Sequence, residues 1–357
     1  MKNLRFGVYG AGSIGCYLGA HLVRQAVPTV LLGRARLQQE IRTHGLRVTG
    51  LNQIDFHLEP ADIDYVTEPE CLADCNVILV TVKSLDTGSA GEALRRLQPN
   101  GKPRLIISFQ NGLSNADILR RALPDDDVRA GMVPYNVVNN GKGHFHCGTS
   151  GALLVAAQPV PVGPDCSTSA PQFAHSIAEV LAVMRAAGLT IASHANLGGV
   201  LRGKLIFNLN NALNALAGIP LREELSDRTY RRLLADIMRE ALQVYKAAGT
   251  PPVRVGKMIP ALAPVILGLS DWLFFRVAAG MIKIDPEARS SMWEDLNRGR
   301  PTEIDFLNGE IVRLAAENGL QAPLNAAVVR LIRAAEQRGE GSPGLGAAQL
   351  RSAMLAD

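Results

Sequence analysis

The sequence predicts an α/β protein in which an N-terminal doubly wound domain is followed by an all-helical C-terminal domain. The chain opens with a strand, a glycine turn and a helix, in LRFGVYGAGSIG and the CYLGAHLVRQ that follows. Apolar runs of strand length then alternate with helical stretches, which is typical of a mostly parallel sheet. After about Ala195 the strand patterns stop and helical patterns continue.

The elements follow in order along the chain. The second strand is PTVLLGR, and later strands are predicted at CNVILVTVK and RLIISFQNG, with helices at TGSAGEALRRLQ and LSNADILRRAL. The run LRVTGLNQIDFHLE alternates like a hairpin, and HFHCGTSGALLVAA adds short strands. Helices are then predicted at KLIFNLNNALNAL, DRTYRRLLADIMREALQVYKAAG, TEIDFLNGEIVRLAAENG and PLNAAVVRLIRAAEQRG, the last ending at GEGSPG. We therefore divide the chain into domains at residues 1–194 and 195–357.

Composition restricts the class of protein. Of the 357 residues, 47% are hydrophobic and 20% are charged, which is typical of a globular chain with two cores. The formal charge is only +4 and the basic residues are scattered, so we expect a small anionic ligand and no nucleic-acid partner. The proline-broken run at residues 258–270 is too short to span a bilayer, so we predict a buried or lid-like segment and no membrane attachment.

The cysteines and histidines do not predict a disulfide framework or a metal site. Five cysteines at irregular spacing favour reduced thiols in a cytoplasmic protein. Cys71 and Cys75 lack a second pair, and His144 and His146 lack ligand partners apart from Cys147. The apolar N-terminal run contains glycines and no convincing cleavage site, so we do not interpret it as a secretion signal.

A dinucleotide site is predicted at GAGSIG, between the first strand and the first helix. Gly10 and Gly12 let the backbone turn tightly and approach a pyrophosphate, and Gly15 allows close packing of helix on strand. Ser13 and Ile14 open the helix, whose N-terminus stabilises the phosphate charge. The spacing alone is weak evidence, but the strand, turn and helix context makes an ordinary glycine turn the poorer interpretation.

The end of the second strand favours NADP over NAD. An NAD site usually has an acid there to bind the ribose hydroxyls, whereas this chain has LLGRAR. Arg34, with Arg36 nearby, can pair with a 2′-phosphate and stack on adenine. The alternative for Arg34 is a solvated arginine at a helix start.

The stretch KLIFNLNNALNAL has helical spacing of leucines but carries a lysine and four asparagines. Lys204, Asn208 and Asn211 fall on one face of the predicted helix. Because asparagine competes with helical backbone hydrogen bonds, this stripe needs a partner outside the helix. That partner is either a buried neighbouring element or a substrate held by a lysine and amides.

Farther on, Thr302 and Asp305 form a capping-box pattern that places Glu303 in the first turn of a helix. A glutamate there is commonly a partner of the helix dipole. Ser290 and Ser291 are likewise compatible with an ordinary helix start.

Together these residues resemble the ketopantoate reductase (2-dehydropantoate 2-reductase) family. GAGSIG, the arginine after the second strand, TVKS, QNG, the lysine-asparagine helix and SSMWEDLNRGRPTEID with its following NG occur in the family's order over most of the chain. The resemblance implies a Rossmann-type NADP-binding domain, a helical domain like that of 6-phosphogluconate dehydrogenase, and an active site in the cleft between them.

The resemblance also implies an NADP-dependent oxidoreductase that reduces 2-dehydropantoate to pantoate with NADPH, in pantothenate and coenzyme A biosynthesis. Lys204 matches the family's general acid, and Glu303 matches an acid whose partner is the substrate or that lysine. The other implied positions are Lys83 and Asn111 at the nicotinamide end of the cofactor, and Asn208, Asn111 and Ser291 at the substrate.

One family asparagine has no direct counterpart. Its usual position, eight residues after the lysine, is Ala212 in this chain. We choose Asn211 as the substitute because it stays on the same helical face, and Asn210 and Asn214 remain alternatives.

The stretch from Pro251 to Pro286 is longer than the family leads us to expect. It keeps open a reductase of another 2-keto acid or of an imine on the same fold, and a non-catalytic NADP-binding sensor is the alternative from a different class. The apolar residues 258–275 are a candidate surface for a homodimer.

Overall fold

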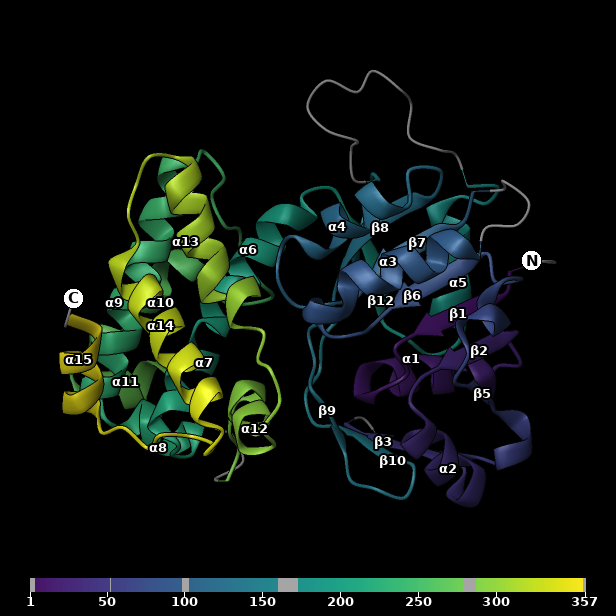
Figure 1. Ribbon diagram of the computed structural model, residues 1–357, viewed down its shortest axis with the longest axis horizontal. Coiled ribbons are helices and arrows are strands. Elements are labelled where there is room, and N and C mark those ends of the chain that lie inside the picture. The colour runs from purple at the N-terminus through teal and green to yellow at the C-terminus, as the bar shows by residue number, and fades with distance from the viewer. Residues whose placement is uncertain (1–3, 52, 98–102, 160–172, 279–286, 356–357) are drawn as a thin grey trace. The chain divides into compact units, whose positions relative to one another are not determined.

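The computed structural model describes residues 4–51, 53–97, 103–159, 173–278 and 287–355 (Figure 1). Contacts divide the chain into two compact units, Met1–Leu197 and Gly198–Asp357. The first combines strands and helices; within the described residues of the second, helices are joined only by loops and one isolated bridge between Val255 and Met258. The predicted fold class is therefore confirmed.

An eight-stranded sheet is the centre of the N-terminal unit, with strand order β12-β11-β8-β7-β6-β1-β2-β5. The six strands from β8 to β5 are parallel and have the order of a doubly wound nucleotide-binding fold; β11 joins β8 antiparallel. The strand bounds are β1 Phe6–Tyr9, β2 Thr29–Leu32, β5 Asp64–Val66, β6 Val77–Val80, β7 Leu105–Ser108, β8 Asp127–Met132, β11 Leu153–Ala156 and β12 Ile191–His194.

A second sheet of four strands, in the order β4-β3-β10-β9, confirms the predicted hairpin excursion. Strands β3 (Leu46–Gly50) and β4 (Ile54–Leu58) are antiparallel, and β10 (His144–Cys147) pairs with both β3 and β9 (Val137–Asn139).

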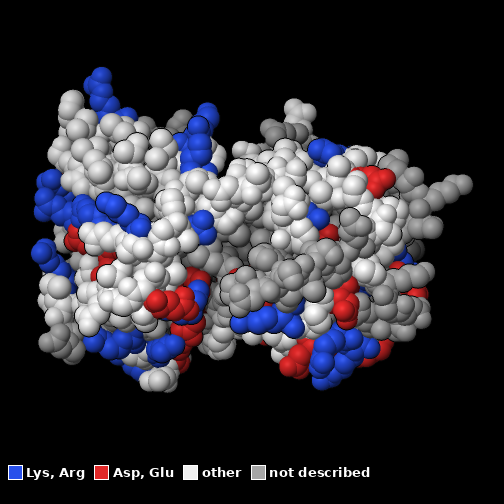
Figure 2. Space-filling model, turned by 90° about the horizontal axis from the view of Figure 1, so that it is seen from above, with Lys and Arg blue, Asp and Glu red and all other residues white. Residues whose placement is uncertain are grey.

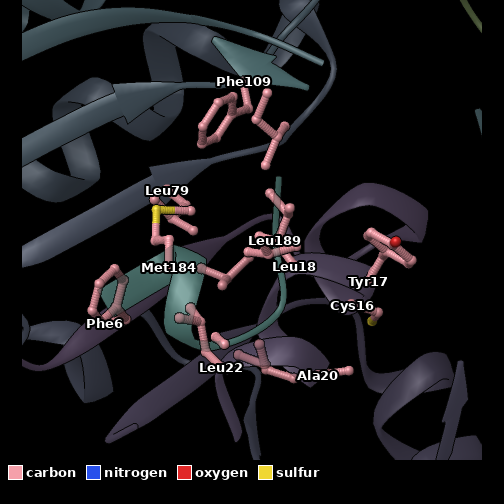
Figure 3. Close-up of a cluster of buried hydrophobic side chains, with 14 of the residues drawn as sticks. Phe6, Cys16, Tyr17, Leu18, Ala20, Leu22, Leu79, Phe109, Met184 and Leu189 are labelled. Atoms are coloured by element: carbon pink, nitrogen blue, oxygen red, sulfur yellow. The ribbon is translucent and has the colours of Figure 1, made fainter. Parts of the chain in front are cut away.

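Helices cover both faces of the large sheet, because its buried strands alternate between two cores. Along β6, Val77 and Leu79 belong to one core, whereas Ile78 and Val80 belong to the other. Figure 3 shows the first core, where Phe6 and Leu79 from the sheet lie near Leu18, Leu22 and Met184 from two helices. The helices are α1 Ser13–Arg24, α2 Ala35–His44, α3 Thr87–Arg96, α4 Asn115–Ala122 and α5 Ile177–Ala186, with 3-10 turns η1 Pro60–Asp62, η2 Pro69–Leu72 and η3 Ser84–Asp86.

The C-terminal unit is built around the long amphipathic helix α9. Its helices are α6 Leu197–Asn208, α7 Asn210–Ala217, α8 Leu221–Ser226, α9 Arg228–Ala247, α10 Ala263–Gly268, α11 Asp271–Val277, α12 Ser291–Asn297, α13 Asn308–Glu317, α14 Pro323–Arg338 and α15 Ala347–Leu355, with 3-10 turns η4 Pro260–Leu262 and η5 Ile304–Phe306. The predicted stop at GEGSPG is confirmed, since Gly339 ends α14 in the left-handed conformation. Helix α15 after it was not predicted.

The apolar stretch that starts at residue 258 is only partly described. The apolar segment 258–270 is not simply buried: Leu267 is buried, but Val265 is 61% exposed. The end of the longer stretch, 279–286, lies outside the described residues. No helix in the described ranges is both long and apolar enough to cross a bilayer. On the face in Figure 2, Lys and Arg side chains lie in separate groups with uncharged surface between them.

Candidate active site

Two of the three motif glycines are required by the packing of the protein itself. Gly10 follows β1 with φ 104°, and a Cβ there would lie 2.6 Å from Val82. A Cβ on Gly15 would lie 2.7 Å from the Gly10 carbonyl oxygen and 2.7 Å from Thr81 Oγ1. These two glycines therefore hold α1 close against the sheet.

Gly12 is different, because the protein leaves open space beside it. Gly12 is exposed, and a Cβ on Gly12 would have the Gly10 carbonyl oxygen, at 4.0 Å, as its nearest neighbour. Gly12 is the N-cap of α1, so the first-turn N–H groups of Ser13 and Ile14 have no acceptor within the helix. An uncrowded helix N-terminus at the end of a parallel strand fits a pyrophosphate group.

Side chains from two neighbouring segments hold the glycine loop in place. Thr81 Oγ1 donates to Gly10 O at 2.8 Å, and the hydroxyl of Tyr65 donates to Ala11 O at 2.9 Å. Burial raises the pKa of Tyr65, so it stays a donor. The carbonyl oxygens of Gly10 and Ala11 thus accept hydrogen bonds from within the protein, which fixes the conformation of the glycine loop.

Arg34 lies at the start of α2, after β2, which neighbours β1 in the sheet. It is exposed at the N-cap position, preceded by Gly33 and no acid. Arg36 instead forms an ion pair with Glu40 at 3.3 Å. Of the two arginines, Arg34 is therefore the better placed for a 2′-phosphate.

Lys83 and Asn111 follow β6 and β7, on the other side of β1 from Arg34. Because the strands are parallel and adjacent, both residues lie at the same edge of the sheet as the glycine loop. Ser84 Oγ donates to the Asn111 carbonyl oxygen at 2.9 Å, and Asn115 Nδ2 also donates to that oxygen. The backbone of Asn111 is thus fixed by the segment that carries Lys83.

A buried polar network supports this edge, and the sequence analysis missed it. Thr87 Oγ1 lies 2.7 Å from Asn115 Oδ1 and accepts from Gln110 Nε2 at 2.7 Å, while Ser108 Oγ donates to Gln110 Oε1 at 2.8 Å. All four residues are buried. The signal in the sequence was present: several polar residues directly follow two apolar strands, where a core would be expected.

In the helical unit, Lys204 of α6 and Glu303 interact electrostatically. Burial lowers the pKa of Lys204 to about 8, and the Glu303 carboxylate opposes that shift. Both side chains are partly buried, as is Asn208 one turn after the lysine. An ammonium whose pKa lies near neutrality is suited to giving up a proton.

The predicted capping box at Thr302 is wrong in its detail. Thr302 Oγ1 accepts from the Ile304 N–H at 3.3 Å, but the N-cap of the short turn η5 is Glu303, and Asp305 pairs with Arg333 at 2.6 Å. The α-helix begins only at Asn308. Glu303 therefore precedes a 3-10 turn, where its carboxylate acts on Lys204.

The predicted lysine-asparagine helix is divided at Leu209 into α6 and α7. Asn214 is fully buried: its Nδ2 donates to Glu224 Oε2 at 2.6 Å, and its Oδ1 accepts from the Ser290 N–H at 2.8 Å. Of the two alternatives given by the sequence, a buried neighbouring element is therefore the partner of Asn214. Asn211 is partly exposed and remains our choice for the substrate.

Helix α12 starts beside α7, where Ser290 is its N-cap. Ser290 Oγ accepts from the Trp293 N–H at 3.1 Å and donates to the Asn211 carbonyl oxygen at 2.8 Å. The next residue, Ser291, is exposed at the first helical position. The described residues thus bring Asn211 and Ser291 to one region of the helical unit.

The histidines and cysteines have structural surroundings. His144 Nε2 and His146 Nδ1 lie 2.8 and 2.9 Å from Thr49 Oγ1. Cys71 is an exposed free thiol, and Cys16, Cys75 and Cys147 are buried free thiols, while Cys166 lies outside the described residues. In the ranges with assigned structure, no group of three or more His, Cys, Asp or Glu side chains is arranged to hold a metal ion.

Comparison with known proteins agrees over nearly the whole chain. The profile of the family "Ketopantoate reductase PanE/ApbA" matches residues 6–159, and that of its C-terminal domain matches residues 196–336. A 2-dehydropantoate 2-reductase of Halobacterium salinarum is 27% identical over 338 residues, 94% of this chain and 100% of the relative.

Solved structures give the same result. A PanE/ApbA family ketopantoate reductase from Ralstonia eutropha is 29% identical, with a TM-score of 0.77 over 94% of this chain and 100% of that one. A 2-dehydropantoate 2-reductase from Geobacter metallireducens is 26% identical, with a TM-score of 0.74 over 93% of this chain and 100% of that one. With two consecutive family profiles and full-length relatives, the chain belongs to the ketopantoate reductase family.

Proposed function

We propose that the protein reduces 2-dehydropantoate to pantoate with NADPH, in the formation of pantothenate and coenzyme A. One observation carries the proposal: in a chain of this family, the partly buried Lys204 interacts with Glu303, and burial lowers the pKa of the lysine to about 8. Relatives that align over almost the whole chain are named for this reaction. Residues 1–194 would bind the cofactor and residues 195–357 the substrate.

The cofactor site fits a phosphorylated dinucleotide. The open space beside Gly12 and the first-turn amides of Ser13 and Ile14 would receive the pyrophosphate. Arg34 would bind the 2′-phosphate that distinguishes NADPH from NADH. Lys83 and Asn111 would line the reactive end, two and three strands away from Arg34 in the sheet.

The residues of the helical unit supply the proton and the orientation. When bound, the reduced nicotinamide supplies the hydride that reaches the C2 carbonyl. Lys204 stabilises the negative charge that grows on the carbonyl oxygen and then protonates it. Glu303 favours the protonated lysine, and Ser291 with Asn208 and Asn211 would bind the carboxylate and hydroxyl of the substrate.

The test follows oxidation of NADPH, and separately NADH, with ketopantoate and with a panel of other 2-keto acids. The Lys204→Ala variant should lose turnover by about three orders of magnitude and keep its affinity for NADPH, because the lysine acts on the carbonyl oxygen of the substrate and not on the cofactor. Lys246→Ala, which removes an exposed lysine of α9, is the matched control and should behave like the wild type. Near-normal turnover of Lys204→Ala would remove that lysine from the mechanism.

A reductase of another 2-keto acid or of an imine is the second candidate. The longer stretch after Pro251 favours it, since its described part places apolar residues such as Ile259 and Trp272 on the surface of the helical unit. Turnover confined to another member of the panel would select this candidate. NADPH binding without turnover of any keto acid or imine would select a sensor.

A further inference from the structure

Glu224 of α8 is a buried carboxyl group outside the proposed catalytic set. It is 1% exposed, and its helix packs against α7 and α9. Burial raises the pKa of Glu224 to about 8, and the hydrogen bonds from Asn214 and Asn210 oppose that shift. The neutral acid is therefore the main form near pH 7.

The hydrogen bonds around Glu224 leave one buried carboxyl oxygen and one buried amide oxygen without a donor among the described residues. Oε2 accepts from Asn214 Nδ2 at 2.6 Å. Oε1 and the Oδ1 of Asn210 are both buried acceptors without a donor among the described residues, and the Asn210 side chain lies within hydrogen-bond reach of Glu224. With the Asn210 amide turned so that its Oδ1 faces Glu224, a proton on Oε1 satisfies both atoms.

A continuous set of hydrogen bonds leads from Glu224 to the start of α12. Asn214, held by Glu224, accepts from the Ser290 N–H at 2.8 Å. Ser290 also bonds the Asn211 carbonyl oxygen and caps α12 through Trp293. Ser290 is thus fixed on both its backbone and its side chain, directly before the exposed Ser291.

We propose that Glu224 is a positioning residue, which through Asn214 and Ser290 holds Ser291 in the place where it binds the carboxylate of the keto acid. The inference rests on the proposed function, because it assigns Ser291 to the substrate. Asn214 of α7 then has a specific purpose, because its side chain joins Glu224 to the Ser290 N–H at the start of α12, and the backbone carbonyl of Asn211 holds the Ser290 hydroxyl.

The other titratable side chains described on α8 and at the start of α9 are exposed or hydrogen-bonded to groups other than Glu224. On α8, Glu223 is exposed, and at the start of α9 Asp227 caps its own helix through the Thr229 N–H. Tyr230 of α9 donates its hydroxyl to Leu345 O, and burial raises its pKa.

Two cations near these elements are already engaged. Arg231 of α9 donates to the Leu225 and Ser226 carbonyls and pairs with Asp271. Before α12, Arg289 lies over the ring of Trp293. Neither cation is among the causes that shift the pKa of Glu224.

The test compares Glu224→Gln, Glu224→Ala and the exposed control Glu223→Gln. Glutamine reproduces the neutral acid, since its Oε1 accepts from Asn214 and its Nε2 donates to Asn210. The KM for the keto acid is measured from pH 6.5 to 9.5. Deuterium uptake of the peptide that spans residues 287–297 is measured at pH 7 and 9 and corrected at each pH for the base-catalysed intrinsic exchange rate. Lys204 also loses its proton at high pH in the wild type and in all three variants, and this loss lowers mainly kcat, so KM is the quantity compared.

In the wild type and in Glu223→Gln, KM should rise by about tenfold above pH 8 as Glu224 ionises, with faster deuterium uptake at the start of α12. Glu224→Gln should keep the low KM and slow uptake at every pH, and Glu224→Ala should show high KM and fast uptake already at pH 7. The same pH dependence of KM in the wild type and Glu224→Gln would overturn the proposal.

The two proposals fail in distinguishable ways. If the wild type turns over no keto acid, the proposed function fails, and the deuterium uptake alone decides whether Glu224 positions α12. If turnover is normal and uptake near Ser290 is the same in all variants, the function stands and the role of Glu224 is refuted. If Glu224→Ala does not fold, Glu224→Gln and its control still decide the outcome.

Discussion

Replacing Glu224 by glutamine should change how the stability of the helical unit depends on pH. The folded carboxyl has a pKa of about 8, compared with its ordinary value of 4.5. Below pH 4.5 the group is protonated in the folded and the unfolded chain, so pH has no effect through it. Between pH 4.5 and 8 the unfolded chain releases this proton while the folded chain keeps it, and the free energy of unfolding falls as pH rises.

The slope of this loss is about 1.4 kcal/mol per pH unit for one proton. Between pH 5 and pH 7 the wild type should therefore lose about 3 kcal/mol relative to Glu224→Gln, which has no proton to release. Above about pH 8 both states are ionised and the difference stays constant. The contribution of this group to stability is thus complete below pH 4.5 and lost once the pH passes 8.

Urea unfolding at pH 5, 6 and 7 measures the effect. Both tryptophans of the chain, Trp272 and Trp293, belong to the helical unit, so their fluorescence reports the unfolding of that unit. Glu223→Gln makes the same chemical change at an exposed position and should follow the wild type. A free-energy difference between Glu224→Gln and the wild type that does not change over this pH range would refute the protonated, buried state of Glu224.

Three further outcomes follow from the structure. Turnover should fall as the pH rises through about 8, where Lys204 loses its proton. In Glu303→Gln this fall in turnover should move to lower pH, because the carboxylate that raises the pKa of Lys204 is gone. Profiles of kcat against pH check both expectations, and an unchanged profile in Glu303→Gln would exclude Glu303 as the partner of Lys204. Gly12→Ala should leave the melting temperature unchanged but weaken NADPH binding by at least about tenfold in a titration, since its methyl group enters open space that the pyrophosphate needs; unchanged affinity would place the cofactor elsewhere. Asp126→Asn should cost about 3 to 5 kcal/mol in chemical denaturation, because it leaves the buried guanidinium of Arg104 without its carboxylate partner at 2.7 Å; a loss below 1 kcal/mol would contradict this.

The fold could be predicted because its signals are local. Glycines at fixed positions after an apolar strand, buried strands without alternation and helices with regular apolar spacing each depend on neighbours along the chain. The two sheet faces explain the continuous apolar runs, since Val77 to Val80 all face a core. Helix α15 was not predicted because GEGSPG, which correctly indicated the end of α14, was also interpreted as the end of the helical part of the chain.

The candidate site was less accessible, because its contacts join distant segments. The helix pattern showed that the asparagines need partners, but only the fold brings Glu224 and Ser290 to Asn214. The capping box failed for a similar reason: Asp305 forms an ion pair with Arg333 from a helix much later in the chain. The roles of Lys204, Glu303 and Ser291 remain predictions that the variants above test.

The order of strands in the large sheet separates the residue proposed to select the cofactor from the residue proposed for the reactive end. Arg34 follows β2 and Asn111 follows β7, with β1 and β6 between them. At the usual strand spacing the two ends of the site lie about 14 Å apart across the sheet. If Arg34 binds the 2′-phosphate as proposed, a change at Arg34 should therefore alter the choice between the two nicotinamide dinucleotides without touching the proposed reactive end. Mutation and selection are free to adjust the two properties independently, in the laboratory as in evolution.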